Sequence, residues 1–135
     1  MTPRPQIGLL DTSVVIDLPR MAAQDLPAFP TISAITLAEL GVGPHVAANA
    51  RTRQQRQLVL QQAEASFDAL PFDDACARRF SLVAASLRES GRKTKARAFD
   101  ALIAATALAN DLPLYTRNPS DFINIEGLEV HSVEQ

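Results

Sequence analysis

Four acidic residues stand where their carboxylates can act together, although they are spread over most of the chain. They are Asp11, Glu39, Asp100 and Asp121. Asp11 directly follows a short apolar run, and Asp121 comes five residues after Thr116, where another apolar run ends. If these runs are parallel strands of one sheet, the residues that follow them meet at one edge, with Asp100 on a helix beside them.

Carboxylates held within a few ångströms of one another repel, and some take up protons unless a cation neutralises them. Carboxylate oxygens without histidine or cysteine select a hard ion, Mg²⁺, for which Mn²⁺ can substitute. Such an ion positions and activates water against a phosphodiester, and a pair of ions stabilises both the attacking and the leaving oxygen. The four acids therefore predict metal-dependent phosphodiester hydrolysis, with the number of ions left open.

Two of the acids also have an ordinary structural interpretation. Asp11 can act as the N-cap of a following helix, which is the commoner role for an aspartate at such a position. Glu39 stands at capping-box spacing from Thr36, so it can close the first turn of a helix that begins there. Both alternatives remain open at the level of the sequence.

Asp100 is harder to explain structurally. The helix macrodipole favours it if its helix begins near Phe99, but the preceding alanines indicate an earlier start, within 95–111. An aspartate on an apolar helix face needs a partner, and no lysine or arginine lies between Arg97 and Arg117. Asp100 is therefore the residue that most favours the metal interpretation of the whole set.

Length and composition indicate one ordinary globular domain spanning residues 1–135. The single cysteine, Cys76, excludes an intrachain disulfide and a cysteine-based metal site, and is typical of a reducing compartment. The apolar run near the N-terminus is short for a signal peptide, and no apolar stretch approaches the length of a membrane span. We expect a cytoplasmic protein without a membrane partner.

Short apolar runs alternate with longer helical patterns along the chain. This order predicts a three-layer α/β/α sandwich with a mostly parallel sheet. The helix at 48–67 is expected to bury a stripe that includes Leu58 and Ala65. The expected strands are 6–10, 28–33, 67–72, 112–116 and 128–133, and the expected helices are 12–20, 36–43, 48–67, 73–90 and 95–111.

Three blocks of the sequence resemble the PIN-domain ribonucleases, and specifically the VapC toxins of bacterial toxin–antitoxin pairs. The blocks are "LLDTSVVIDL", "ISAITLAELGVG" and "FDALIAATALANDLPLYTRNPSDF". The resemblance covers nearly the whole chain. It implies a PIN-like fold and an Mg²⁺-dependent endoribonuclease whose metal ligands are Asp11, Glu39, Asp100 and Asp121.

The fourth acidic position departs from the commonest family pattern. Many PIN domains carry an acid where this chain has Asn118, whereas here the candidate is Asp121. The resemblance leaves open which of the two fills the position, and gives supporting roles to Ser13, Thr116 and Asn118. It further implies an RNA substrate, a homodimer, and a VapB-type antitoxin whose C-terminal segment occupies the acidic groove, often with an arginine among the carboxylates.

The net charge of -2 hides an uneven distribution. Segment 51–97 carries ten basic residues against five acidic ones, and the densest basic positions come just before Asp100. Positive charge beside an acidic site can hold the phosphates of RNA, although a solvated surface explains it equally well. The candidates for weak RNA contacts are Arg92, Lys93, Lys95 and Arg97.

Two other functions remain open from the residues. Proteins that carry an aspartyl phosphate also place an aspartate after the first strand of such a sheet. Here, however, Ser13 stands where a dehalogenase-like enzyme has a second aspartate, and both lysines precede Asp100. The other alternative is a non-catalytic module that binds RNA or a partner protein through the same surface, which the full set of four acids disfavours.

Overall fold

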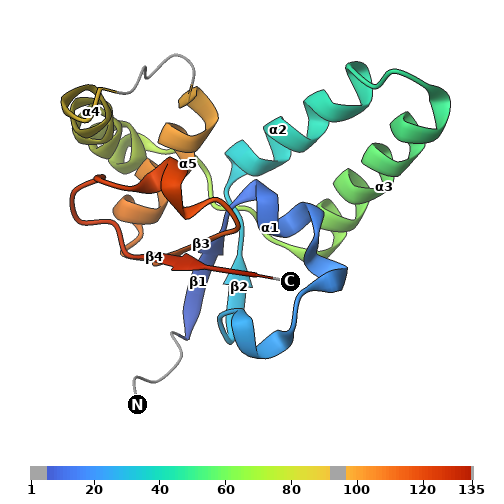
Figure 1. The fold of residues 1–135 in the computed structure, drawn as a ribbon, viewed down its shortest axis with the longest axis horizontal. Helices are drawn as coiled ribbons and strands as arrows, with labels where there is room; N and C mark the ends of the chain where they lie inside the picture. The colour runs from blue at the N-terminus through green and yellow to red at the C-terminus, as the bar shows by residue number, and fades with distance from the viewer. Residues whose placement is uncertain (1–5, 92–96, 135) are drawn as a thin grey trace.

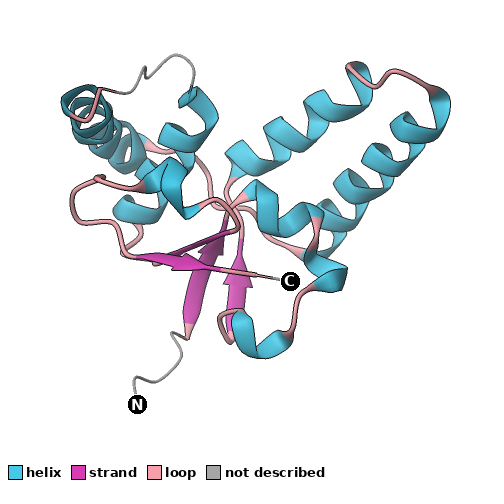
Figure 2. Ribbon diagram, in the orientation of Figure 1, coloured by secondary structure: helices cyan, strands magenta, loops and turns pink. Residues whose placement is uncertain are grey.

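The protein is described from a computed structural model, which places residues 6–91 and 97–134. A four-stranded sheet lies at its centre, in the order β2-β1-β3-β4, and every pairing in it is parallel. Helices flank this sheet (Figure 2). The strands are β1 (Ile7–Leu10), β2 (Phe29–Thr31), β3 (Leu114–Thr116) and β4 (Val130–Ser132).

The helices form two groups, one on each face of the sheet (Figure 1). Helices α2 and α3 run side by side as a hairpin next to α1, and α4 packs against α5 on the opposite side. None of the described helices combines the length and the apolar content needed to cross a bilayer. The α-helices are α1 (Thr12–Ile16), α2 (Ala34–His45), α3 (Ala50–Ser66), α4 (Asp74–Glu89) and α5 (Ala98–Ala109), with 3₁₀ turns η1 (Leu18–Arg20), η2 (Ala23–Asp25) and η4 (Pro119–Phe122).

The sheet divides the hydrophobic core into two clusters because successive side chains of a strand point to opposite faces. Leu9 and Leu114 pack with buried residues of α4 and α5. Their neighbours Leu10 and Tyr115 pack with α1, α2 and α3. Both faces are covered, which is why these short strands read as continuous apolar runs. The predicted α/β sandwich with a parallel sheet is confirmed.

The register of the central pair brings the ends of two distant strands together. Leu10 of β1 lies opposite Tyr115 of β3. The pairing continues one residue beyond β1, because the Asp11 amide donates to the Tyr115 carbonyl at 2.8 Å. The carboxyl ends of β1 and β3 therefore lie side by side, as the sequence predicts.

The predicted strand at 67–72 and the predicted helix at 12–20 differ from the structure. The expected strand at 67–72 is reduced to one isolated bridge between Leu70 and Ser33. The expected helix at 12–20 ends at Ile16, and Pro19 lies in the separate turn η1. A proline is accommodated at the start of such a turn, where its missing amide costs nothing.

Helix α2 begins and ends elsewhere than predicted. Ser33 is its N-cap and accepts a hydrogen bond from the Thr36 amide at 3.1 Å, so Thr36 does not cap a helix. The helix then continues through both of its glycines, which the prediction took as its end, to His45. The predicted apolar stripe of α3 is also wrong: Leu58 is 53% exposed, and Ala63 is the buried residue of that helix.

Gly8 in β1 allows a close approach that no other residue type permits. A Cβ built there would lie 2.6 Å from Cε1 of Tyr115 and 2.9 Å from Cβ of Pro27. We expect Gly8→Ala to lower the free energy of unfolding by about 1–3 kcal/mol through overpacking. Gly41→Ala is the matched control, because a Cβ there meets nothing within 4 Å and alanine is favoured within a helix by roughly 1 kcal/mol. Urea unfolding of both variants checks the expectation, and equal shifts would contradict it.

Candidate active site

Asp11 is fixed by both its main chain and its side chain. It directly follows β1 and is the N-cap of α1, where Oδ1 accepts a hydrogen bond from the Thr12 amide at 2.8 Å. Its side chain is enclosed, with the residue only 4% exposed. The capping role considered as an alternative is therefore real, and it uses only one of the two carboxylate oxygens.

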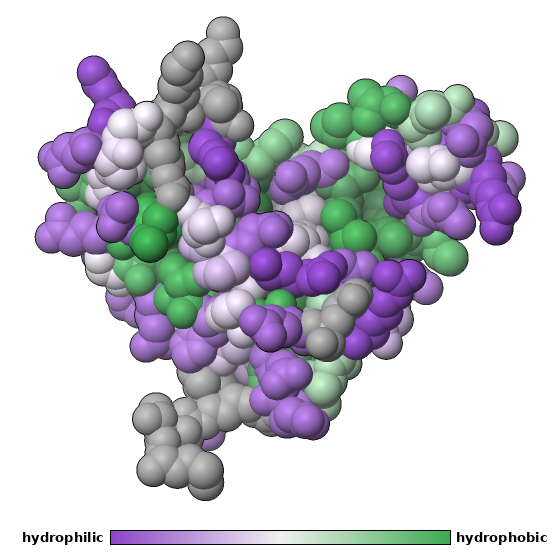
Figure 3. All heavy atoms as spheres, viewed as in Figure 1, coloured by the Kyte–Doolittle hydropathy of each residue, from purple (hydrophilic) through white to green (hydrophobic). Residues whose placement is uncertain are grey.

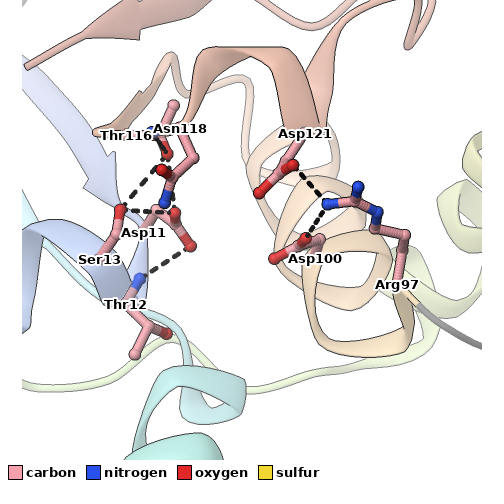
Figure 4. A network of polar contacts seen from close by, with 8 residues as sticks. All are labelled: Asp11, Thr12, Ser13, Arg97, Asp100, Thr116, Asn118 and Asp121. Carbon is pink, nitrogen blue, oxygen red and sulfur yellow. Dashed lines mark hydrogen bonds and ion pairs between the residues drawn. The ribbon is translucent and has the colours of Figure 1, made fainter.

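Two hydroxyl groups hold the other oxygen of Asp11. Ser13 Oγ and Thr116 Oγ1 each donate to Oδ2 at 2.8 Å (Figure 4). Each hydroxyl oxygen in turn accepts a hydrogen bond from a main-chain amide. The Arg117 amide donates to Ser13 Oγ at 3.1 Å, and the Asn118 amide donates to Thr116 Oγ1 at 3.0 Å. Since a hydroxyl has one proton to donate, these amides aim both protons at Asp11.

Asn118 takes part mainly through its backbone. It is exposed and lies at the start of η4, the turn that carries Asp121. The Asp121 amide bonds to the Asn118 carbonyl at 3.0 Å, which fixes the path of the turn. The three residues expected to support the site, Ser13, Thr116 and Asn118, thus form one connected network with Asp11.

Glu39 reaches the same site from α2. Its Oε1 atom is buried and has no hydrogen-bond partner within the described part of the chain. Because Ser33 rather than Thr36 caps α2, Glu39 lies beyond the first turn and has no capping function. Burial raises the pKa of Glu39 and the nearby Asp11 raises it further, while the Thr12 hydroxyl opposes both effects.

Asp100 and Asp121 face this site from the opposite side, and Arg97 lies between them (Figure 4). One guanidinium nitrogen, Nη1, is hydrogen-bonded to Oδ1 of Asp121 and lies 3.8 Å from Oδ2 of Asp100. The expectation that Asp100 has no local cation is therefore wrong. The stretch without lysine or arginine begins only after Arg97. Arg97 is three positions before Asp100, and side chains three positions apart on a helix are direct neighbours.

Asp100 also lies in the first turn of α5, which begins at Ala98. The macrodipole therefore favours its charge, contrary to the expectation of an earlier helix start. Even so, its pKa is raised to about 6. Burial is the largest cause, followed by the charges of Asp11, Asp121 and Glu39, and Arg97 offsets them only in part.

The carboxylates of the site thus make ionisation of one another less favourable. The pKa of Asp11 is also raised, mainly by burial and to a smaller extent by Asp121, against the three hydrogen bonds that favour its charged form. Among the described residues, the side chains do not yet bring three or more acidic, histidine or cysteine groups within the spacing that would hold a metal ion. The donor set still fits a hard cation: its ligands are oxygens, they repel, and Oε1 of Glu39 lacks a donor.

A cavity of about 470 Å³ opens beside Glu39, between α1 and the α2–α3 hairpin. In the surface view, hydrophobic side chains gather next to the hairpin, and hydrophilic ones cover the central region (Figure 3). The cavity thus has a largely apolar wall, and Glu39 lines the end next to the acidic site. It is lined by Thr12, Ile16, Glu39, Leu40, Gly43, Thr52, Gln55, Arg56 and Val59.

The basic residues expected to contact RNA are only partly described. Arg97 lies among the acids, whereas Arg92, Lys93 and Lys95 are outside the described residues. A second arginine, not predicted from the sequence, lies near the site: Arg117, directly after Thr116, forms an ion pair with Asp17 at the end of α1. The partners are 100 positions apart, so their spacing in the sequence does not signal the contact. Only the position of Arg117 directly after β3 and of Asp17 directly after α1 points to it.

The raised pKa of Asp100 makes stability depend on pH. The folded protein keeps the Asp100 proton up to about pH 6, whereas the ordinary pKa of an aspartate is 3.8. The free energy of unfolding therefore falls as the pH rises between these two values. Asparagine mimics the protonated acid. In metal-free protein, we expect Asp100→Asn to raise the free energy of unfolding at pH 7.5 by about 1–3 kcal/mol, and to change it little near pH 4. Urea unfolding with chelator at both pH values tests this, and an equal difference at the two would contradict it.

Comparison with known proteins identifies the family. Residues 8–128 match the PIN domain. Ribonuclease VapC5 of Mycobacterium tuberculosis is 36% identical over 94% of this chain and 93% of its own length. A chain in the crystal structure of VapBC-5, from a family of toxin–antitoxin systems in the same organism, superposes with a TM-score of 0.83, covering 96% of this chain and all of that one. A toxin–antitoxin complex from Klebsiella pneumoniae gives 31% identity and a TM-score of 0.60, over 90% of this chain and 94% of that chain. The chain belongs to the PIN-domain family, within the group of the VapC ribonucleases.

Proposed function

We propose that this protein is a metal-dependent endoribonuclease and the toxin of a toxin–antitoxin pair. The observation that carries the proposal is the convergence of Asp11, Glu39, Asp100 and Asp121 on one space, with the pKa of three of them raised. The names of the relatives, ribonucleases and toxin–antitoxin complexes, support RNA as the substrate.

The four acids are proposed to hold Mg²⁺, for which Mn²⁺ can substitute. Such an ion, when bound, supplies an activated water and neutralises charge on the phosphodiester. The chain's own contribution is position: Ser13 and Thr116 keep Oδ2 of Asp11 in place, and the Thr12 amide keeps Oδ1 in place. A ligand held by three donors needs no rearrangement when a cation arrives, which favours catalysis.

Asp121 is proposed as the fourth acid in place of Asn118. Its carboxylate lies next to that of Asp100 and faces the Asp11 side of the site (Figure 4). Asn118 contributes the carbonyl that positions the Asp121 amide and the amide that positions Thr116. Both contacts are made by the main chain, so they do not require an acidic side chain at position 118.

The aspartyl-phosphate alternative fits the geometry poorly. A nucleophilic aspartate needs an oxygen with enough open space for a phosphoryl group, and Asp11 is only 4% exposed. Its Oδ2 already accepts two hydrogen bonds, whereas Oδ1 accepts one and keeps a lone pair for a small cation. A non-catalytic binding module remains the second candidate, and the raised pKa of Asp100 argues against it. Carboxylates that repel one another cost stability, a cost that a surface used only for binding RNA would not need.

Cleavage of RNA by the purified protein tests the proposal. We expect cleavage that needs Mg²⁺ or Mn²⁺, stops with chelator, and falls at least 100-fold in Asp11→Asn and Asp100→Asn, because each removes a charged ligand. Asp68→Asn is the control, since it removes an exposed carboxylate outside the site. Circular dichroism confirms that the variants are folded. Cleavage that survives either site substitution contradicts the proposal, and RNA binding without cleavage favours the non-catalytic module.

An antitoxin of the VapB type is the proposed protein partner. The cavity beside Glu39 offers an apolar wall from α1, α2 and α3 that a helix of such a partner can cover, and it leads to the acids. A segment seated there would block both metal and RNA. A homodimer is proposed as well, from the family resemblance alone.

Ile16 tests the antitoxin surface, because it lines the cavity and is 51% exposed. The probe is a VapB-type antitoxin, which we expect a small open reading frame adjacent to the gene to encode. We expect Ile16→Asp to weaken its binding to the toxin at least 10-fold in calorimetry, since a charge then has to be buried in the interface. Leu82→Asp on α4, at 59% exposure, is the matched control and should bind as the unmodified protein does. Equal binding by both variants would contradict this placement.

A further inference from the structure

We propose that Arg97 takes the place of a second metal ion, so that the site takes up one divalent cation and not two. The inference rests on the proposed function only in taking the four acids as the ligand set. The inference goes beyond the proposed function because it assigns part of the positive charge in the site to Arg97, a side chain of the protein itself.

The guanidinium of Arg97 lies between two of the four carboxylates. Its Nη1 atom contacts Oδ1 of Asp121 and lies 3.8 Å from Oδ2 of Asp100 (Figure 4). One nitrogen is thus shared between two carboxylates. An ion that bridged the same two carboxylates would need the space in which this nitrogen lies.

Helix α5 gains no stability from an arginine at its N-terminus. Arg97 is the N-cap of α5 and makes no side-chain capping bond. Arginine is a poor N-cap, and positive charge at a helix N-terminus opposes the macrodipole. Each of the other described α-helices has an N-cap whose side chain accepts a hydrogen bond from a main-chain amide of the first turn. These N-caps are Asp11, Ser33, Asn49 and Asp73. The acids, and not the helix, therefore account for the position of Arg97.

Positive charge is distributed unevenly over the site. Asp100 and Asp121 share Arg97, whereas neither Asp11 nor Glu39 has a cationic partner among the described residues. Oε1 of Glu39 is buried without any partner in that part of the chain. The uncompensated charge thus lies on the side of Asp11 and Glu39, where one ion is sufficient to neutralise it.

The chemistry of guanidinium suits the role of a fixed cation. It stays protonated at every pH at which the protein works, and it carries five N–H donors in one plane. The Arg97 side chain is 39% exposed, so a phosphate group can reach it from solvent. It can therefore stabilise negative charge on the substrate, which is the task of the second ion in two-metal nucleases.

Direct counting of bound Mn²⁺ tests the proposal. Arg97→Gln removes the charge but keeps a polar side chain of similar reach. We expect one Mn²⁺ per chain in the unmodified protein and two in Arg97→Gln, measured by the loss of the free-Mn²⁺ signal in electron paramagnetic resonance and by calorimetry. Arg117→Gln is the matched control: Arg117 also pairs with an aspartate, Asp17, at a comparable exposure of 32%. It should bind one Mn²⁺.

The metal dependence of RNA cleavage gives a second readout. At low Mn²⁺ we expect the rate to rise with the first power of concentration in the unmodified protein and with the second power in Arg97→Gln. At low Mn²⁺ the Arg97→Gln rate should be roughly 10-fold or more below that of the unmodified protein, because one charged contact to the transition state is lost. The rate should recover at high Mn²⁺. A residue that only stabilises the fold would show neither change.

Two ions in the unmodified protein, or one ion in Arg97→Gln, would overturn the proposal. Weaker RNA binding by Arg97→Gln with an unchanged ion count would reassign Arg97 to phosphate contacts alone, and would overturn it as well. These results are separate from a failure of the proposed nuclease function, because the ion count does not depend on cleavage.

Discussion

The parallel pairing of β1 with β3 is the constraint on which the site depends. It places Asp11 and Thr116, 105 positions apart, close enough for a hydrogen bond of 2.8 Å. The Asp11 amide extends the same pairing by donating to the Tyr115 carbonyl. A slip of one residue would turn Thr116 toward the opposite face, where it could not reach Asp11, and would exchange the side chains that the strand contributes to the two core clusters. The packing of both faces therefore fixes the geometry of the acids.

The same arrangement concentrates negative charge, and this charge opposes folding. Burial raises the pKa of Asp11, Glu39 and Asp100 above the ordinary values for carboxyl groups. Hydrogen bonds to Asp11 and the ion pair of Arg97 with Asp121 reduce the cost without removing it. A fold tolerates such a cluster only because the two hydrophobic cores supply stability elsewhere, which is typical of functional sites.

Much of the fold could be predicted because its signals are local. An apolar run such as that at 6–10, followed by an acid, indicates a buried strand that ends at a site, and the alternation with helices then predicts a parallel sheet. The bridge at Leu70 shows the limit of this reasoning, since a run of strand-like residues forms a strand only where a neighbour has free backbone groups. The cap of α2 was misplaced because Ser33 and Thr36 are both good N-caps, and the choice depends on where β2 stops.

The contacts of the arginines could not be predicted for a different reason. The pair of Arg117 with Asp17 joins residues 100 positions apart, and only the completed sheet brings them together. The pair of Arg97 with Asp100 is local, but its formation depends on where α5 starts and on the direction of a long side chain. Sequence spacing fixes neither of these.

The structure also changes which acid argues most strongly for a metal. From the sequence this was Asp100, because it lacked a nearby cation. In the fold, Asp100 has Arg97 beside it and the N-terminus of α5 to favour its charge. Glu39 has lost its capping explanation, since Ser33 begins α2, and its buried Oε1 has no partner among the residues placed. A buried carboxylate oxygen without a donor is costly unless something binds it. The case for a cation therefore rests on Glu39 and Asp11, on the side of the site that Arg97 does not neutralise.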